Sequence, residues 1–177
     1  MSVLLLTGRP GAGKTTALRH AVDLLHGRRV AGFYTEEIRE RGQRRGFRAV
    51  SFDGRAWDLA HVGFRDAAAR VGRYGVDVGV MDTLAQTLGP RQAVDAWLVD
   101  EIGRMECLSP AFVTAMRALL AGAVPVVATV AQRGGGFISE VKRRPDAELR
   151  TVTHATRDAL PREIADWLAA RWPRRRS

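Results

Sequence analysis

Residues 8–15 carry the residue types and spacing that point most directly to chemistry. They read Gly-Arg-Pro-Gly-Ala-Gly-Lys-Thr and match the pattern G-x-x-x-x-G-K-[ST]. Glycines here allow successive backbone N–H groups to surround phosphate oxygens, because no Cβ atoms obstruct them. The pattern predicts that Lys14 reaches the terminal phosphates of a bound nucleotide and that the Thr15 hydroxyl binds Mg²⁺. A glycine-rich turn without a ligand is the alternative.

A pair of carboxylates forms the second candidate group. Residues 96–99 are apolar, are expected to form a buried strand, and lead directly into Asp100 and Glu101. We expect Asp100 to hold the Mg²⁺ shell and Glu101 to accept a proton from the attacking water, or to orient that water. A kinase excludes water and presents an acceptor hydroxyl, so the pair favours hydrolysis. A solvated loop after a core strand is the alternative.

These groups require a strand, a loop and a helix in succession, and the chain supplies them. Strands alternate with helices, which indicates an α/β fold with a mostly parallel sheet. The expected strands and helices follow the apolar periodicity of the chain. Strands are predicted at residues 2–7, 30–36, 47–52, 55–59, 96–99, 124–130 and 148–153, and helices at residues 14–26, 80–88, 110–120, 137–144 and 161–171.

One part of the chain departs from this alternation. Residues 35–39 and 47–52 are expected to form a β-hairpin inserted in the parallel scheme, because residues 41–44 suit a turn. Residues 61–79 are rich in glycine and are expected to be irregular. No repeat or linker interrupts the sequence, so we predict a single domain over residues 1–177.

Composition narrows the class of protein. The chain has 177 residues, of which 46% are hydrophobic and 27% charged, as in ordinary globular domains. No apolar run approaches the ~20 residues of a membrane span, and the single Cys107 fits a reducing cytoplasm. The net charge of +9 allows nucleic acid as a partner, but arginine-rich composition and a polyanionic nucleotide are the favoured explanation. We expect a cytoplasmic monomer without membrane contact.

With these motifs described, the chain resembles the THEP-type nucleoside-triphosphatase family, which includes the cancer-related nucleoside-triphosphatase. The likeness covers nearly the whole chain. Its most specific parts are Gly-Phe-Tyr-Thr-Glu-Glu at residues 32–37 and Asp-Glu-Ile-Gly-Arg-Met-Glu at residues 100–106. Residues 71–78 and 152–158 add to it, although Thr156 stands where the family often has asparagine.

The resemblance implies a P-loop fold of the RecA-like branch, with the Glu-bearing strand between other strands. It implies Mg²⁺-dependent hydrolysis of ATP, GTP, CTP and UTP to diphosphate and phosphate, with broad base selectivity and slow turnover. Lys14 and Glu101 are the expected catalytic residues, and Thr15 and Asp100 the expected metal ligands. The expected nucleotide-binding residues are Gly8, Arg9, Pro10, Gly11, Ala12, Gly13, Lys14, Thr15, Thr16, Leu98, Val99, Asp100, Glu101, Ile102, Gly103, Arg104 and Met105.

Four further side chains are candidates for accessory roles. Thr129 ends an apolar strand and would reach the γ-phosphate or the water if that strand lies beside Asp100; a purely structural threonine is the alternative. Arg133 and Arg157 are candidates for stabilising transition-state charge, with Arg133 favoured because it lies on a glycine-rich loop. Glu36 ends a strand and would position base or water, with hairpin support as the equal alternative.

Two other functions remain open from the sequence. Small phosphate-loop proteins are often nucleotide or polynucleotide kinases, although Glu101 and the lack of an arginine-rich lid argue against this. A nucleotide-dependent switch or RNA-associated module is the other alternative, because the segment 39–48 contains five arginines.

Overall fold

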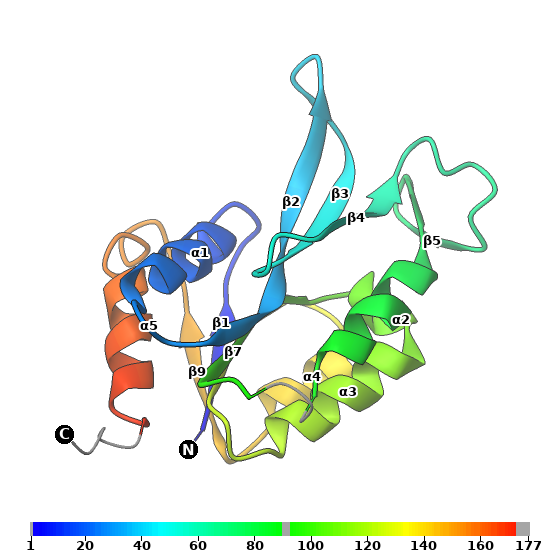
Figure 1. The fold of residues 1–177 in the computed structure, drawn as a ribbon. Helices are drawn as coiled ribbons and strands as arrows, with labels where there is room; N and C mark the ends of the chain where they lie inside the picture. Colours follow the sequence, from blue (N-terminus) through cyan, green and yellow to red (C-terminus); the bar gives the residue numbers. More distant parts are fainter. Residues whose placement is uncertain (1, 90–92, 173–177) are drawn as a thin grey trace.

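The computed structural model describes residues 2–89 and 93–172 and places helices on both faces of one sheet (Figure 1). Residues 1, 90–92 and 173–177 of the predicted domain lie outside the described residues. Within the described part, nine strands pair in the order β5-β6-β4-β3-β2-β7-β8-β1-β9. The fold is therefore the expected α/β arrangement, with a parallel half that holds the sequence motifs and an antiparallel half beside it.

The parallel half has the predicted RecA-like strand order. Each of its neighbouring strands runs parallel to the next, and β8 separates β1 from β7. The phosphate loop after β1 and the carboxylates at the end of β7 therefore lie at the same edge of the sheet, one strand apart. These strands, from the outer edge inward, are β9 (Ala147–Thr151), β1 (Val3–Thr7), β8 (Val126–Val130), β7 (Ala96–Ile102) and β2 (Val30–Glu40).

Alternation along the buried strands creates two hydrophobic cores. In β1, Leu4 and Leu6 pack towards α1 and α5, whereas Val3 and Leu5 pack towards the helices on the other face. A strand covered by helices on both faces needs apolar residues at every position, which explains the unbroken apolar runs. The helical elements are α1 (Lys14–Leu24), α2 (Val78–Thr87), the 3₁₀ helix η1 (Glu106–Leu108), α3 (Pro110–Leu120), α4 (Phe137–Lys142) and α5 (Leu160–Ala169). None of the described helices combines the length and the apolar character that crossing a bilayer requires.

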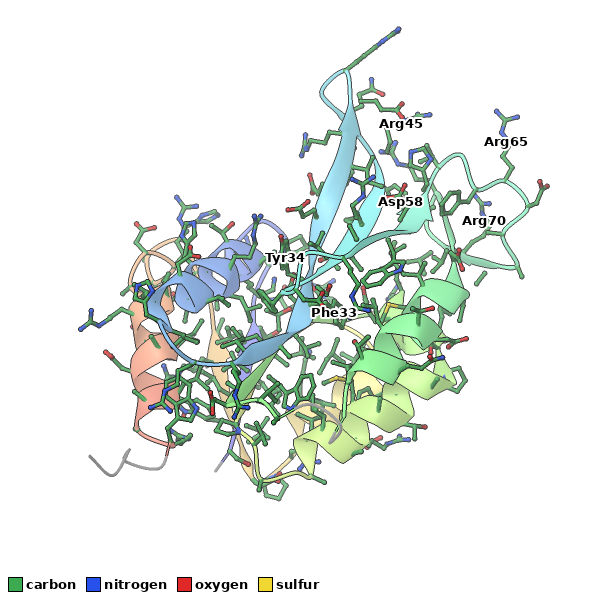
Figure 2. The ribbon with its side chains drawn as sticks, in the orientation of Figure 1. Phe33, Tyr34, Arg45, Asp58, Arg65 and Arg70 are labelled. Carbon is green, nitrogen blue, oxygen red and sulfur yellow. The ribbon has the colours of Figure 1, made fainter. Side chains whose placement is uncertain are left out.

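The antiparallel half grows from a single long strand. β2 pairs with β7 over its first residues, then continues out of the body and pairs with β3 (Gln43–Ser51) as a projecting hairpin (Figure 1). Figure 2 labels Phe33 and Tyr34 at the base of the projecting part and Arg45 far along it. The predicted hairpin is thus present, but its first strand is the outward continuation of β2 and not a separate element. β4 (Ala56–His61) pairs with the other edge of β3.

The expectation that residues 61–79 are irregular is correct for residues 62–68 but wrong for most of the remainder. This stretch contains β5 (Ala69–Val71), β6 (Tyr74–Val76) and the first turn of α2. The two strands have three residues each, too few for an apolar periodicity, and β6 is held by pairing with β4. A Cβ on Gly75 would lie 2.1 Å from the Phe64 carbonyl oxygen, so this glycine reflects close packing.

Candidate active site

The phosphate loop is shaped by glycines that admit no side chain. Gly8 has φ +153° and a Cβ there would lie 2.4 Å from the carbonyl oxygen of Val152. Gly13 has φ +95°, in the left-handed region, and immediately precedes α1. The loop therefore lies tightly against the end of β9 and directs the N-terminal end of α1 at the space above the sheet, where an anion is stabilised.

Lys14 is the cation of this loop. It is 8% exposed, and its Nζ donates hydrogen bonds to the carbonyl oxygens of Gly8, at 3.0 Å, and Arg9, at 3.2 Å. The ammonium group is therefore held within the loop that is expected to bind phosphate. Neutral carbonyl oxygens are weaker acceptors for an ammonium group than charged phosphate oxygens are. Phosphate oxygens can therefore replace the two carbonyls as partners of Lys14.

Asp100 is the centre of a buried hydrogen-bond network at the end of β7. It is fully buried, and its Oδ2 accepts from the Thr15 Oγ1 at 2.7 Å. The same oxygen accepts from the Thr35 Oγ1 at 3.2 Å and from the Thr35 backbone N–H at 3.3 Å, while Thr129 Oγ1 donates to Oδ1. Donors from α1, β2 and β8 thus hold the Asp100 carboxylate in place. Their hydrogen bonds offset the free-energy cost of burying this carboxylate away from water.

Thr35 is a site residue that the sequence argument missed. The residue of this strand predicted from the sequence was Glu36, but successive strand side chains point to opposite faces, so Thr35 points the other way. Gly32 brings β2 close enough for the contact, because a Cβ there, at φ +120°, would lie 1.9 Å from the Leu98 carbonyl oxygen. The string Gly-Phe-Tyr-Thr-Glu-Glu at residues 32–37 was the available signal.

Glu101 is a partly buried carboxyl beside this network. Burial raises its pKa above the ordinary range of a glutamate, and the negative charge of Asp100 raises it further. The positive charges of Lys14 and Lys142 act in the opposite direction. A carboxylate with a raised pKa holds a proton more readily than a solvated one, which suits a group that receives a proton from water.

A cavity of about 530 Å³ joins these groups. Its walls come from the phosphate loop, from β2 and β3, from the segment after β7 and from the loop after β8. Its volume lies within the range of about 300–1,000 Å³ that is usual for ligand sites, and Lys14 and Glu101 are both part of its lining. The lining residues are Gly8, Pro10, Lys14, Thr35, Arg44, Phe47, Val71, Glu101, Gly103, Arg104, Met105, Glu106, Ala131, Gln132 and Arg133.

Comparison with known proteins decides the family. A family model described as NTPase matches residues 3–165, which is most of the chain. The chain belongs to this NTPase family. It is 40% identical over 173 residues to the nucleoside-triphosphatase THEP1 of Thermofilum pendens, covering 94% of each chain. It is 35% identical over 180 residues to the human cancer-related nucleoside-triphosphatase, covering 91% of this chain and 93% of that protein.

A solved structure of the NTPase family supports the fold. The crystal structure of THEP1 from Aquifex aeolicus superposes with a TM-score of 0.81 at 31% identity, covering 94% of this chain and 98% of that one. The resemblance proposed from the motifs is therefore confirmed, as is the P-loop NTPase fold. The phosphate loop and the Asp-Glu pair lie in this NTPase chain where the RecA-like strand order requires them.

Of the eight predicted residues from Leu98 to Met105, four line the cavity and four do not, and of the four that do not, only Asp100 has a polar side chain. Leu98, Val99 and Ile102 have no exposed surface, and their side chains lie in the hydrophobic cores on either side of the sheet. Their expected part in nucleotide binding is corrected accordingly, since β7 carries Asp100 and Glu101 to the edge and these apolar residues fix the strand. Gly103, Arg104 and Met105 do line the cavity.

The accessory candidates separate into two groups. Arg133 lines the cavity, and Thr129 lies beside Asp100 on the neighbouring strand as expected, where its hydroxyl donates to that carboxylate. Glu36 instead pairs with Arg19 at 3.3 Å, and Arg157 packs its side chain over Gly13 beside a separate groove that includes Thr16. Glu36 and Arg157 do not line this cavity, although Arg157 lies against the phosphate loop at Gly13, and their accessory roles remain predictions.

The oxygen atoms near the loop suit a magnesium ion. Mg²⁺ prefers oxygen ligands and is commonly held by one or two protein groups, water and the phosphates of its substrate. The Thr15 hydroxyl and the Asp100 carboxylate oxygen lie 2.7 Å apart, close enough for ligands on one ion. Among the described residues no cluster of three His, Cys, Asp or Glu side chains is present.

Proposed function

We propose that this chain hydrolyses nucleoside 5′-triphosphates to diphosphate and phosphate in a Mg²⁺-dependent reaction, with broad base selectivity and slow turnover. Nucleoside-triphosphatase activity follows from its membership of the NTPase family. The observation that carries the proposal is Glu101, a carboxyl of raised pKa that lines the same cavity as Lys14, next to Asp100 and its hydroxyl network. A proton acceptor at this place supports water as the attacking group in a chain of this family.

Triphosphate binding rests on the loop and its lysine. The backbone N–H groups of residues 11–15 and the N-terminal end of α1 stabilise the anion, and Lys14 exchanges its carbonyl partners for phosphate oxygens. Thr15 and Asp100 are the protein ligands for Mg²⁺, which neutralises charge on the phosphates when it is bound. Thr35 and Thr129 hold the Asp100 carboxylate in orientation.

Water is activated by Glu101. The carboxylate takes one proton from the water while the oxygen of the water bonds to the γ-phosphorus and the bond to the bridging oxygen breaks. The diphosphate leaves with the electrons of that bond. Arg104 and Arg133 are exposed cations at the cavity wall and are placed to offset charge on the transferred group.

The architecture supports broad base selectivity and slow turnover. Every group assigned above acts on the triphosphate or its metal, and none recognises a base, so ATP, GTP, CTP and UTP present the same reacting atoms. Arg133 is exposed and is followed by three consecutive glycines. A cation on such a segment must be ordered before it acts, which lowers the rate.

Phosphate release without an acceptor tests this function. Wild type and Glu101→Gln are compared with ATP, GTP, CTP and UTP in the presence of Mg²⁺, with Glu163→Gln on the exposed face of α5 as the matched control. We expect release from all four nucleotides in wild type and control. Glu101→Gln is expected to lose at least ~10²-fold in kcat and to keep nucleotide binding, because the amide cannot accept the proton.

Two outcomes contradict the proposal in different ways. Tight nucleotide binding by wild type without phosphate release would favour a kinase or a nucleotide-dependent switch. Release by Glu101→Gln at the wild-type rate would keep the activity but remove Glu101 as its base.

A further inference from the structure

The phosphate loop borders a second hollow for which the mechanism above has no role. This groove of about 360 Å³ lies between α1 and the loop that joins β9 to α5. Gly13 and Thr16 line it on one side, and Arg157 and Pro161 on the other. It shares no lining residue with the cavity described above. The phosphate loop therefore borders two separate hollows, and the nucleoside of a bound triphosphate has two places to lie.

The direction of the reaction decides between these two places. Glu101 activates the water, so the water attacks the γ-phosphorus from the cavity that Glu101 lines. In an in-line displacement the leaving diphosphate lies opposite the attacking oxygen. The diphosphate therefore extends away from Glu101, along the loop and towards the N–H groups at the N-terminal end of α1. The nucleoside is joined to the far end of the diphosphate and so reaches the groove at Gly13 and Thr16.

Arg157 is the cation of this groove, and hydrogen bonds within its loop hold its backbone in place. The Arg157 N–H donates to the Thr153 carbonyl oxygen at 3.0 Å. The Thr153 N–H in turn donates to the Thr156 hydroxyl, also at 3.0 Å. A turn closed by a threonine side chain in this way is fixed before a ligand arrives. The Arg157 side chain therefore starts from a defined position beside α1.

The side chain of Arg157 lies against the phosphate loop. A Cβ built on Gly13 would lie 3.2 Å from Arg157 Cδ, so the aliphatic part of the arginine covers this glycine. Beyond this contact, Arg157 Nε pairs with Asp158 Oδ1 at 3.4 Å, and Nη1 lies 3.0 Å from His154 Nδ1. The N–H bonds of a guanidinium lie in its plane, so such partners meet its edge. Because 45% of the side chain is exposed, the planar group remains accessible to a ligand.

A planar guanidinium suits a nucleobase. It stacks on aromatic rings, and its charge is attracted by the face of the ring. Every nucleobase has such a face, so stacking tolerates all four bases alike. A base held by Arg157 in this way agrees with the broad base selectivity proposed above.

We propose that the groove between α1 and the loop after β9 holds the nucleoside of the substrate, with the Arg157 guanidinium stacked on the base. The inference rests on the proposed function, because the direction of the triphosphate follows from the role of Glu101. Arg157 lies at the nucleoside end and contributes to binding, not to the reaction at the γ-phosphorus. This role differs from stabilisation of transition-state charge, the role predicted for Arg157 from the sequence.

Kinetics with four nucleotides and one nucleoside-free competitor test the proposal. Formation of diphosphate from ATP, GTP, CTP and UTP is measured with Mg²⁺ for wild type, Arg157→Ala and Arg162→Ala. The last is the matched control, because Arg162 is an exposed arginine of α5 that pairs with Asp166 at 3.4 Å. With slow chemistry KM reports binding. Arg157→Ala is expected to raise KM for all four nucleotides about 3- to 30-fold, as loss of a cation–π contact predicts, and to leave kcat within ~2-fold.

Inorganic tripolyphosphate is the competitor, because it carries three phosphates without a nucleoside. Its inhibition constant against ATP is expected to stay within ~2-fold of wild type in Arg157→Ala. Arg162→Ala is expected to change no constant by more than ~2-fold.

Binding without turnover separates the groove from the activity. Calorimetry with Mg²⁺ compares ADP with pyrophosphate, which differ by the nucleoside. Arg157→Ala is expected to weaken ADP about 3- to 30-fold and pyrophosphate less than ~2-fold. Arg157→Lys keeps the charge but lacks the planar group, so it is also expected to weaken ADP.

Four results would overturn the proposal. A fall in kcat of Arg157→Ala with KM unchanged would assign the arginine to the transition state, and equal weakening of ADP and pyrophosphate would assign it to the phosphates. Unchanged ADP binding would place the nucleoside elsewhere, and a loss confined to one base would replace stacking by recognition of that base. If Arg157→Ala does not fold, Arg157→Lys decides. If wild type hydrolyses no nucleotide, the proposed function fails, while the comparison of ADP with pyrophosphate still tests the groove.

Discussion

The edge of the sheet that carries the phosphate loop and Asp100 differs from the projecting hairpin in how its central charged groups are exposed: Asp100 is buried, whereas the ion pairs of the hairpin are exposed. At the catalytic edge, Asp100 is fully buried and receives hydroxyl donors from three different elements. On the hairpin, Arg48 pairs with Asp58 at 2.6 Å while almost half of each side chain remains exposed. Figure 2 labels Asp58 and Arg45 on this projecting part, away from the helices.

This difference shows that the number of charged residues in a segment does not by itself indicate how much charge is available to stabilise the fold or to bind a partner. Exposed ion pairs contribute little stability, because water and salt replace either partner, whereas a buried carboxylate depends on each of its donors. Several hairpin arginines also have acidic partners: Arg39 and Arg44 pair with Glu37, and Arg45 pairs with Glu40. The basic composition of this segment therefore overstates the charge available to a nucleic acid.

Lys14→Ala gives the largest expected effect and tests the catalytic edge most severely. The substitution removes the cation of the phosphate loop, so we expect kcat/KM for nucleoside triphosphates to fall by at least ~10²–10³-fold. Lys142→Ala is the comparison variant: it removes the other lysine of the chain, which donates to the Gln132 carbonyl oxygen at the cavity wall and acts on Glu101 only through its charge, so a much smaller loss is expected. Equal losses in both variants would show that general charge, and not the loop, binds the phosphates.

Thr129→Val tests how much the hydrogen bonds to the buried Asp100 contribute to the stability of the protein. Valine has nearly the shape of threonine but leaves one oxygen of the buried Asp100 without its donor, which is expected to cost about 1–3 kcal/mol of unfolding free energy. Thr83→Val on the exposed face of α2 is the control and is expected to cost less than ~0.5 kcal/mol. Urea denaturation measures both. Equal losses of unfolding free energy in the two variants would contradict the conclusion that the buried Asp100 carboxylate depends on each of its hydrogen-bond donors.

The Arg48–Asp58 pair supplies the smallest expected effect. A double-mutant cycle with Arg48→Ala and Asp58→Ala is expected to give a coupling below ~1 kcal/mol that decreases further in about 1 M salt. A coupling of about 2 kcal/mol or more would mean that the hairpin behaves like the buried edge, and the contrast between the two regions would fail.

The local sequence was sufficient for the phosphate loop, the Asp100–Glu101 pair and the alternation of strands and helices. Each depends on contiguous residues: the loop needs glycines at fixed spacing, and a buried strand needs an unbroken apolar run. The resemblance of the motifs to a family then implied the RecA-like strand order, which the structure confirms. The roles of Glu101 and Thr15 in the reaction remain predictions.

Only the tertiary structure decided which distant residues meet at that edge. Thr35 reaches Asp100 because Gly32 lets β2 approach β7, and Glu106 approaches Glu101 because Gly103 leaves room between them. Glu36 lies outside the cavity because alternation along β2 points it away from Thr35, and Arg157 lies beside Gly13 and Thr16 in a separate groove. Sequence alone determines which local elements can form. Contacts across the sheet depend on how closely backbones approach, and that is a property of the assembled fold.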